Sequence, residues 1–186
     1  MIDPRNIINH NRTEAELEEL ALFLVMVAGK QAKTTAIKLD KFLGKNAHQP
    51  FLYIRSLVDN FLLTTRLKEI RAGQYNRIAL AFQDLALSRK DLKTITVEEL
   101  EQMHGIGPKS ARCFLSWTRP DVQYAMLDTH ILKYLRDILK VPNVPKSTPS
   151  GKKYLELEKV FLDHAKLLNR NPAELDLEIW KSYQHV

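Results

Sequence analysis

The 186-residue sequence has one cysteine, Cys113, and no apolar run long enough to cross a membrane. One cysteine excludes an internal disulfide and an iron–sulfur or all-cysteine zinc site built by one chain. The longest apolar run, Leu20 to Ala28, is shorter than the roughly 18 residues of a membrane span and predicts a buried helix. The N-terminus, with Asp3 and Arg5, has no signal-peptide pattern. We therefore expect an intracellular protein without membrane contact.

The charge balance is modestly basic. Lysine and arginine number 28 against 22 aspartates and glutamates, a formal net charge of +6. This balance is compatible with a nucleic-acid partner, but many soluble proteins share it, so it favours such a partner only weakly. The length suits one domain, or two small lobes with a shared core.

Helical spacing of apolar residues recurs along the whole chain, and no segment has a convincing β pattern. Thr13 and Thr96 are each followed three residues later by glutamate, the capping-box pattern that starts a helix. Residues 119–127 are expected to be extended, and 141–153 to form a surface loop. The fold class is therefore all-α, with helices predicted at 13–28, 36–44, from 50, 61–70, 75–87, from 96, 108–118, 128–139, 154–168 and 172–184.

The stretch Met103–Ala111, MHGIGPKSA, lies between two helical patterns. Two glycines two residues apart indicate a tight hairpin that needs positive φ or close approach by a partner. Pro108 suits the first position of the second helix, whose free N–H groups can hold a phosphate. Residues 96–118 therefore fit a helix-hairpin-helix that grips a DNA backbone.

Lys109 and Asp128 are expected to lie together at one site beside this hairpin. The second hairpin helix rises roughly 15 Å, and the extended return over 119–127 spans up to about 30 Å, enough to bring Asp128 back. A neutral lysine amine can attack a sugar carbon, and a carboxylate can stabilise the positive charge that develops there. The spacing alone leaves two alternatives open, a phosphate contact for Lys109 and a helix N-cap for Asp128.

These residues resemble a known family. The hairpin Gly-hydrophobic-Gly-x-Lys-x-Ala, followed by Leu127-Asp128-Thr129-His130, is similar to the helix-hairpin-helix (HhH-GPD) DNA glycosylase superfamily, in its endonuclease III and 8-oxoguanine glycosylase branches. The resemblance implies a two-lobed fold of about ten helices in a single unit over 1–186. One lobe would hold 30–127, and the other 1–29 plus 128–186.

The resemblance also implies roles for individual residues. Lys109 matches the lysine of bifunctional glycosylase/lyases, which forms a Schiff base and nicks the strand by β-elimination, and Asp128 matches the essential aspartate. The backbone carbonyls of Glu101, Met103 and Ile106 match ligands of a monovalent cation, Na⁺ or K⁺. Gly105 and Gly107 let the DNA backbone approach.

Other matches have a structural alternative beside the functional one. Gln31 matches the residue that fills the gap left by a flipped base, or is an exposed glutamine at a helix end. His130 matches a DNA contact, although a structural hydrogen bond in the first turn of its helix is favoured. Trp117, Tyr124, Trp180 and Tyr183 are candidates to line the base pocket, and core packing is the alternative for each.

Two departures from the family restrict the expected substrate. The four-cysteine loop of endonuclease III and the N-terminal β domain of eukaryotic 8-oxoguanine glycosylases are both missing from this sequence. The resemblance therefore favours an 8-oxoguanine glycosylase/AP lyase acting as a monomer on damaged double-stranded DNA, with no required cofactor and no iron–sulfur cluster. It would be cytoplasmic and nucleoid-associated in a prokaryote. An oxidised-pyrimidine glycosylase and a non-catalytic DNA-binding module are the alternatives.

Overall fold

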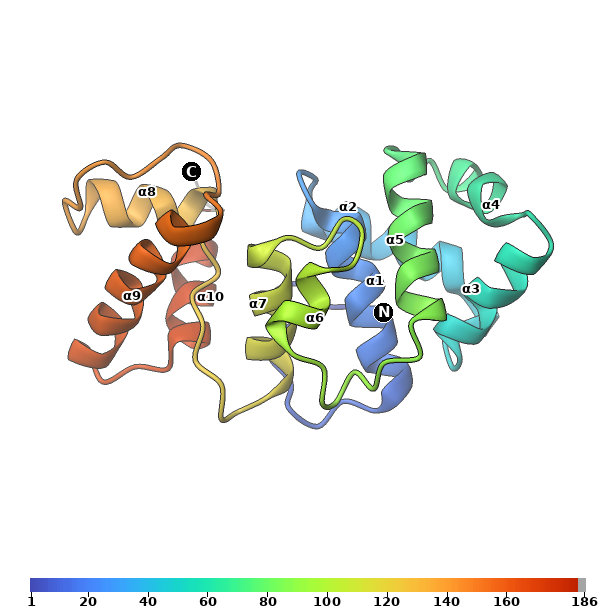
Figure 1. The fold of residues 1–186 in the computed structure, drawn as a ribbon, viewed down its shortest axis with the longest axis horizontal. Coiled ribbons are helices and arrows are strands. Elements are labelled where there is room, and N and C mark those ends of the chain that lie inside the picture. The colour runs from blue at the N-terminus through green and yellow to red at the C-terminus, as the bar shows by residue number, and fades with distance from the viewer. Residues whose placement is uncertain (184–186) are drawn as a thin grey trace. The chain divides into compact units, whose positions relative to one another are not determined.

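The structure, a computed structural model, describes residues 1–183, which form ten α-helices and no β-strand (Figure 1). This confirms the all-α prediction. No helix within the described residues is both long and apolar enough to cross a membrane. A short 3₁₀ turn, Gly44–Asn46, was not predicted. The helices are α1 Glu14–Val27, α2 Ala32–Leu43, α3 Pro50–Asp59, α4 Leu63–Glu69, α5 Tyr75–Leu87, α6 Val97–Glu101, α7 Pro108–Thr118, α8 Thr129–Asp137, α9 Gly151–Leu167 and α10 Pro172–Tyr183.

The predicted helix starts are confirmed where a capping residue marks them. The Thr13 hydroxyl accepts from the backbone N–H of Glu16, whose carboxylate accepts from the Thr13 N–H, so both halves of the capping box form at α1. Thr96 and Glu99 form the same box at α6.

Several helix limits differ from the predicted ones. Helix α2 begins at Ala32, four residues early, and α8 ends at Asp137, two residues early. Helix α4 begins two residues late because Phe61 has φ 57°, a left-handed conformation that no α-helix includes. Helix α9 begins at Gly151, three residues early, and the N–H of Tyr154 donates to the carbonyl of Ser150. The predicted end of the last helix, residue 184, lies outside the described residues.

The chain divides into two compact units, residues 1–107 and 108–186. In the first unit α1 packs against α2, α3 and α5 (Figure 1). Every residue from Leu20 to Met26 is buried, as the apolar run predicts. Phe42 of α2 and Phe82 of α5 meet edge to face, with ring centroids 5.6 Å apart. The predicted assignment of residues 1–29 and 128–186 to one lobe stays a prediction.

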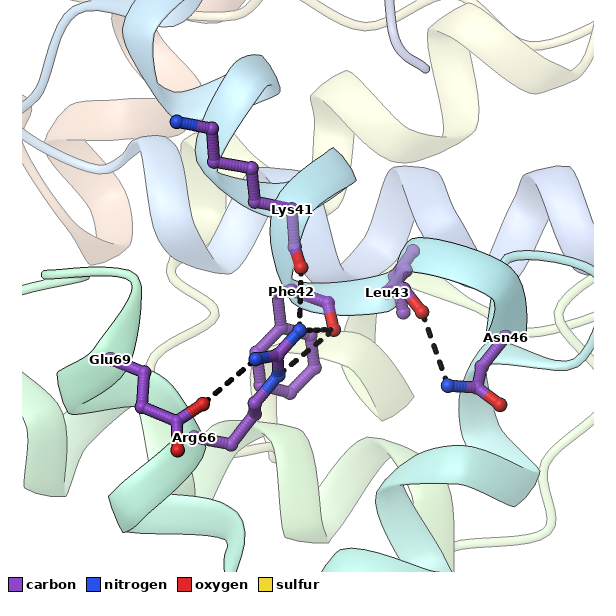
Figure 2. A network of polar contacts seen from close by, with 6 residues as sticks. All are labelled: Lys41, Phe42, Leu43, Asn46, Arg66 and Glu69. Atoms are coloured by element: carbon purple, nitrogen blue, oxygen red, sulfur yellow. Dashed lines mark hydrogen bonds and ion pairs between the residues drawn. The ribbon is translucent and has the colours of Figure 1, made fainter.

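Arg66 of α4 closes the C-terminal end of α2 (Figure 2). Its guanidinium donates to the carbonyl of Lys41 at 2.7 Å and to that of Phe42 at 3.2 Å, and pairs with Glu69 at 2.8 Å. The last carbonyls of a helix have no partner within the helix. A cation there also interacts favourably with the negative end of the helix dipole. This contact joins α2 to α4 in the first unit.

The second unit has a core of its own. Helices α8, α9 and α10 pack together, and the extended segment 125–127 contributes Ala125 and Leu127 to their shared interior. Phe161 of α9 and Leu132 of α8 are fully buried there. This core places the segment that leads into Asp128.

Candidate active site

The hairpin loop requires glycine at position 105. Gly105 has φ 73°, and a Cβ atom there would lie 3.0 Å from the Arg77 guanidinium and 3.3 Å from the Ala81 side chain. Gly107 differs, because a Cβ there would meet nothing within 4 Å. Within the hairpin loop, therefore, the backbone requires glycine at 105, whereas at 107 the absence of a side chain leaves the backbone open to a partner.

Helix α5 holds the hairpin loop in place within the first unit. The Asp84 carboxylate accepts from the backbone N–H of His104 at 3.0 Å and contacts the His104 ring at 2.7 Å. Arg77 contacts the Gly105 carbonyl at 3.4 Å and donates to the Val25 carbonyl at 2.8 Å. No local pattern in the sequence indicated these long-range anchors, which fix the loop that precedes Lys109.

Lys109 lies in the first turn of α7, and Asp128 is the N-cap of α8, both in the second unit. Both are partly buried. The Asp128 carboxylate accepts from the N–H groups of His130 at 2.8 Å and Ile131 at 2.9 Å, both through Oδ1. Asp128 is thus a helix cap, as one of the alternatives held. Only one carboxylate oxygen serves the cap.

The structure brings Lys109 and Asp128 within range of strong electrostatic interaction. Burial alone would lower the pKa of Lys109, but Cys113, Asp128 and Asp176 raise it by more, so that its pKa lies above the ordinary value. Cys113 is fully buried, and burial raises its pKa to about 12, so it is a neutral thiol near pH 7. The carboxyl groups of Asp128 and Asp176, rather than this thiol, are therefore what raises the pKa of Lys109.

Asp176 of α10 is a third member of this cluster that the sequence analysis missed. It is buried, and one of its carboxylate oxygens, Oδ2, has no hydrogen-bond partner among the described residues. Burial and the charge of Asp128 raise its pKa well above that of an ordinary aspartate, although Lys109 opposes the shift. A signal was present, because Ala173 and Ile179 flank Asp176 at helical spacing and place it on the buried face.

Gln31 is the exposed N-cap residue of α2 in the first unit, where its side-chain oxygen accepts weakly from the Thr34 hydroxyl at 3.4 Å. It begins a helix rather than ending one. The His130 ring stacks on Tyr183 with centroids 5.4 Å apart, and the His130 backbone makes the expected cap hydrogen bond. The other candidate aromatics, Trp117, Tyr124 and Trp180, are partly buried.

With this geometry described, the sequence and the fold were compared with known proteins. A family model described as 8-oxoguanine DNA glycosylase (Ogg-HhH) matches residues 5–170, which include Lys109 and Asp128. The chain belongs to the Ogg-HhH family. The resemblance read from the hairpin and the aspartate is thereby confirmed at the level of family.

Named relatives of this Ogg-HhH chain come from archaea. It is 31% identical over 143 residues to the 8-oxoguanine DNA glycosylase/AP lyase of Methanocaldococcus jannaschii, a match that spans 77% of this chain and 61% of that enzyme. It is 28% identical over 188 residues to the enzyme of the same name from Thermoplasma volcanium, covering 96% of this chain and 85% of the relative.

Solved structures share the fold of this Ogg-HhH chain. The crystal structure of the Methanocaldococcus jannaschii 8-oxoguanine DNA glycosylase superposes with a TM-score of 0.69 at 26% identity, over 95% of this chain and 81% of that one. The same protein in complex with a 15mer DNA containing 8-oxoguanine also gives a TM-score of 0.69, at 24% identity, over 98% of this chain and 88% of that one.

Proposed function

We propose that this chain is a DNA glycosylase with AP lyase activity that removes 8-oxoguanine from double-stranded DNA. One observation carries the proposal: a lysine at the start of the second hairpin helix lies beside two carboxyl groups, in a chain of the Ogg-HhH family. Binding to a DNA backbone requires neither carboxyl group. The names of the archaeal relatives support 8-oxoguanine as the base.

The cluster supports a Schiff-base mechanism. The neutral amine of Lys109 attacks the C1′ carbon of the sugar, and the bond to the base breaks, so that the base leaves with the bonding electron pair and takes up a proton. The nitrogen then loses one proton, and the C1′–O4′ bond breaks with its electron pair going to O4′, which takes up a proton, so that the protonated imine forms. Loss of a C2′ proton expels the 3′-phosphate oxygen with the electrons of its C–O bond, which nicks the strand.

The two carboxyl groups have separate tasks in this proposal. Two backbone N–H groups hold Asp128 through Oδ1, and its carboxylate is proposed to stabilise positive charge on the sugar. Lys109 must lose a proton before it attacks. The raised pKa of Asp176 makes its ionised form a stronger base than an ordinary aspartate, so Asp176 is the proposed acceptor.

The hairpin supplies the grip on DNA in this proposal. The free N–H groups at the start of α7 face a phosphate, and Gly107 lets the backbone approach. The carbonyls of Glu101, Met103 and Ile106 are proposed to hold Na⁺ or K⁺. The Met103 carbonyl accepts one hydrogen bond, from Ile106 N at 3.2 Å, so its second lone pair suits a cation. Gln31 would fill the gap left by the flipped base, and one chain would serve one lesion.

Borohydride trapping tests the proposal. Duplexes carrying 8-oxoguanine, an oxidised pyrimidine, uracil or an abasic site are incubated with the wild type and with Lys109→Gln. We expect a covalent adduct on the 8-oxoguanine duplex that the variant does not form, while the variant still binds DNA. An adduct only on the oxidised pyrimidine would shift the assignment to that base. No adduct on any duplex, with DNA still bound, would support the non-catalytic module instead.

A further inference from the structure

The segment 125–127, which leads into Asp128, is buried and belongs to neither a helix nor a strand of the described residues. Its backbone groups must find other partners, because an unpaired buried N–H or carbonyl is costly. The Ala125 N–H donates to the Glu158 carboxylate at 3.1 Å. The Tyr154 hydroxyl donates to the Ala125 carbonyl at 2.7 Å and accepts from the Leu127 N–H at 3.3 Å. Two side chains of α9 thus take the place of a paired strand.

The same Glu158 oxygen also holds the helix that carries Lys109. Glu158 Oε1 accepts from Arg112 Nε at 2.8 Å, and Arg112 lies three residues after Lys109 on α7. The Arg112 guanidinium lies over the Tyr154 ring, 4.5 Å from its centroid. One carboxylate oxygen therefore connects the helix of Lys109 with the segment that ends in Asp128.

We infer that Glu158 and Tyr154 are positioning residues that set the placement of Asp128 relative to Lys109. The inference rests on the proposed function. It assigns a task to the buried ion pair of Arg112 and Glu158. Stability alone does not explain this pair, because buried ion pairs often stabilise a fold no better than apolar residues of the same volume. Neither residue touches the reacting atoms; both act through the backbone of 125–127 and through Arg112.

Tyr154→Phe is the most informative variant. It retains the ring beneath Arg112 and removes only the two hydrogen bonds to Ala125 and Leu127. A displacement of about 1 Å in a reacting group can reduce a rate by about 10²-fold, so we expect the single-turnover rate of Schiff-base trapping to fall at least about tenfold at saturating DNA. The Kd for DNA with an abasic site should stay within about threefold, because Ala125, Met126 and Leu127 are buried and offer no surface to DNA.

Glu158→Gln and Glu158→Ala test the second contact. Glutamine keeps an oxygen that accepts from Ala125 and Arg112, so it should restore most of the rate that alanine loses. Glu158→Ala removes this carboxylate from the buried Arg112, so we expect a lower thermal stability, and thermal unfolding measures how much of the protein is folded. If Glu158→Ala does not fold, Tyr154→Phe decides the inference alone.

Matched controls separate positioning from stability. Tyr134→Phe removes a tyrosine hydroxyl in the same unit, one that bonds His164 and does not contact the segment 125–127. Glu156→Ala removes an exposed carboxylate of the same helix as Glu158. Both controls should trap DNA at the wild-type rate. A Tyr154→Phe rate equal to that of Tyr134→Phe, per folded molecule, would overturn the inference but leave the proposed function intact. Failure of the wild type to trap on any duplex would reject both.

Discussion

The two units of the molecule differ in what their interiors contain. In the first unit the buried polar side chains among the described residues are Glu19 and Thr35, and both have partners. Thr35 donates to the Gln31 carbonyl at 2.8 Å, and Glu19 lies 3.6 Å from the N-terminal amine. The rest of this interior is apolar and centres on α1.

The second unit buries charge beside apolar residues. Its buried polar side chains among the described residues are Arg112, Ser116, Thr118, Glu158 and Asp176. The Asp176 Oδ2 oxygen has no hydrogen-bond partner there. An unpaired buried acid reduces stability, so its presence is better explained by chemistry than by packing. The comparison indicates that the first unit is built for stability and that the second gives up some stability for function.

The largest expected effect tests the claim that the first unit is built for stability. Phe82 is fully buried in the first unit and contacts Phe42, so Phe82→Ala leaves a cavity between α2 and α5. We expect the free energy of unfolding to fall by about 3–5 kcal/mol, measured by urea denaturation. Trapping activity per folded molecule should stay near the wild-type value. A loss of less than about 1 kcal/mol would mean that this interior is not tightly packed.

Asp128→Asn tests the claim that the second unit gives up some stability for function. Asparagine is as good an N-cap as aspartate, so α8 should keep its start and thermal stability should change little. The negative charge beside Lys109 is lost, and we expect single-turnover excision to fall by about 10²–10³-fold, as for removal of one stabilising group at a developing charge. Asp163→Asn, at an exposed position of α9, is the matched control. Near-normal excision by Asp128→Asn would restrict Asp128 to the capping role.

Local signals in the sequence predicted much of the fold and the centre of the candidate site. Thr13 and Thr96 mark helix starts because a capping box needs only four consecutive residues. The Gly105–Lys109 stretch predicted the hairpin because the backbone conformation of a tight turn depends on a few consecutive residues.

The residues that the sequence did not reveal act over long separations. Glu158 and Tyr154 lie about 30 residues after the segment that they hold, and no local pattern connects them with it. Asp176 meets Lys109 only when α10 is folded in place. Arg77 and Asp84 anchor the hairpin loop from an earlier helix. Such contacts depend on tertiary structure, which a single sequence does not encode in any short motif.

A third prediction concerns the pH dependence of stability. The pKa of Asp176 is raised well above 3.8 in the folded state, so in the pH range between 3.8 and its raised value the folded state holds a proton that the unfolded state releases. Stability from this residue is therefore fully present below pH 3.8 and is lost as the pH rises through that range. Asp176→Asn should remove this loss.

Urea unfolding at a series of pH values measures this effect. Because only the wild type loses stability as the pH rises, the Asp176→Asn protein should become more stable than the wild type towards neutral pH. Asp121→Asn, at an exposed position of the same unit, should leave the pH dependence unchanged. A parallel pH dependence for Asp176→Asn and the wild type would contradict the raised pKa and, with it, the proposed role of Asp176 as proton acceptor.

The smallest expected effect returns to the first unit. Thr13→Ala removes the hydroxyl that accepts from the Glu16 N–H at the start of α1, and we expect the free energy of unfolding to fall by about 1 kcal/mol. Thr13→Ser keeps the hydroxyl and should restore most of the loss. Neither variant should alter trapping activity per folded molecule, because the cluster of Lys109, Asp128 and Asp176 lies wholly in the second unit. A change in trapping rate with Thr13→Ala, absent with Thr13→Ser, would show that the two units do not divide stability and chemistry between them.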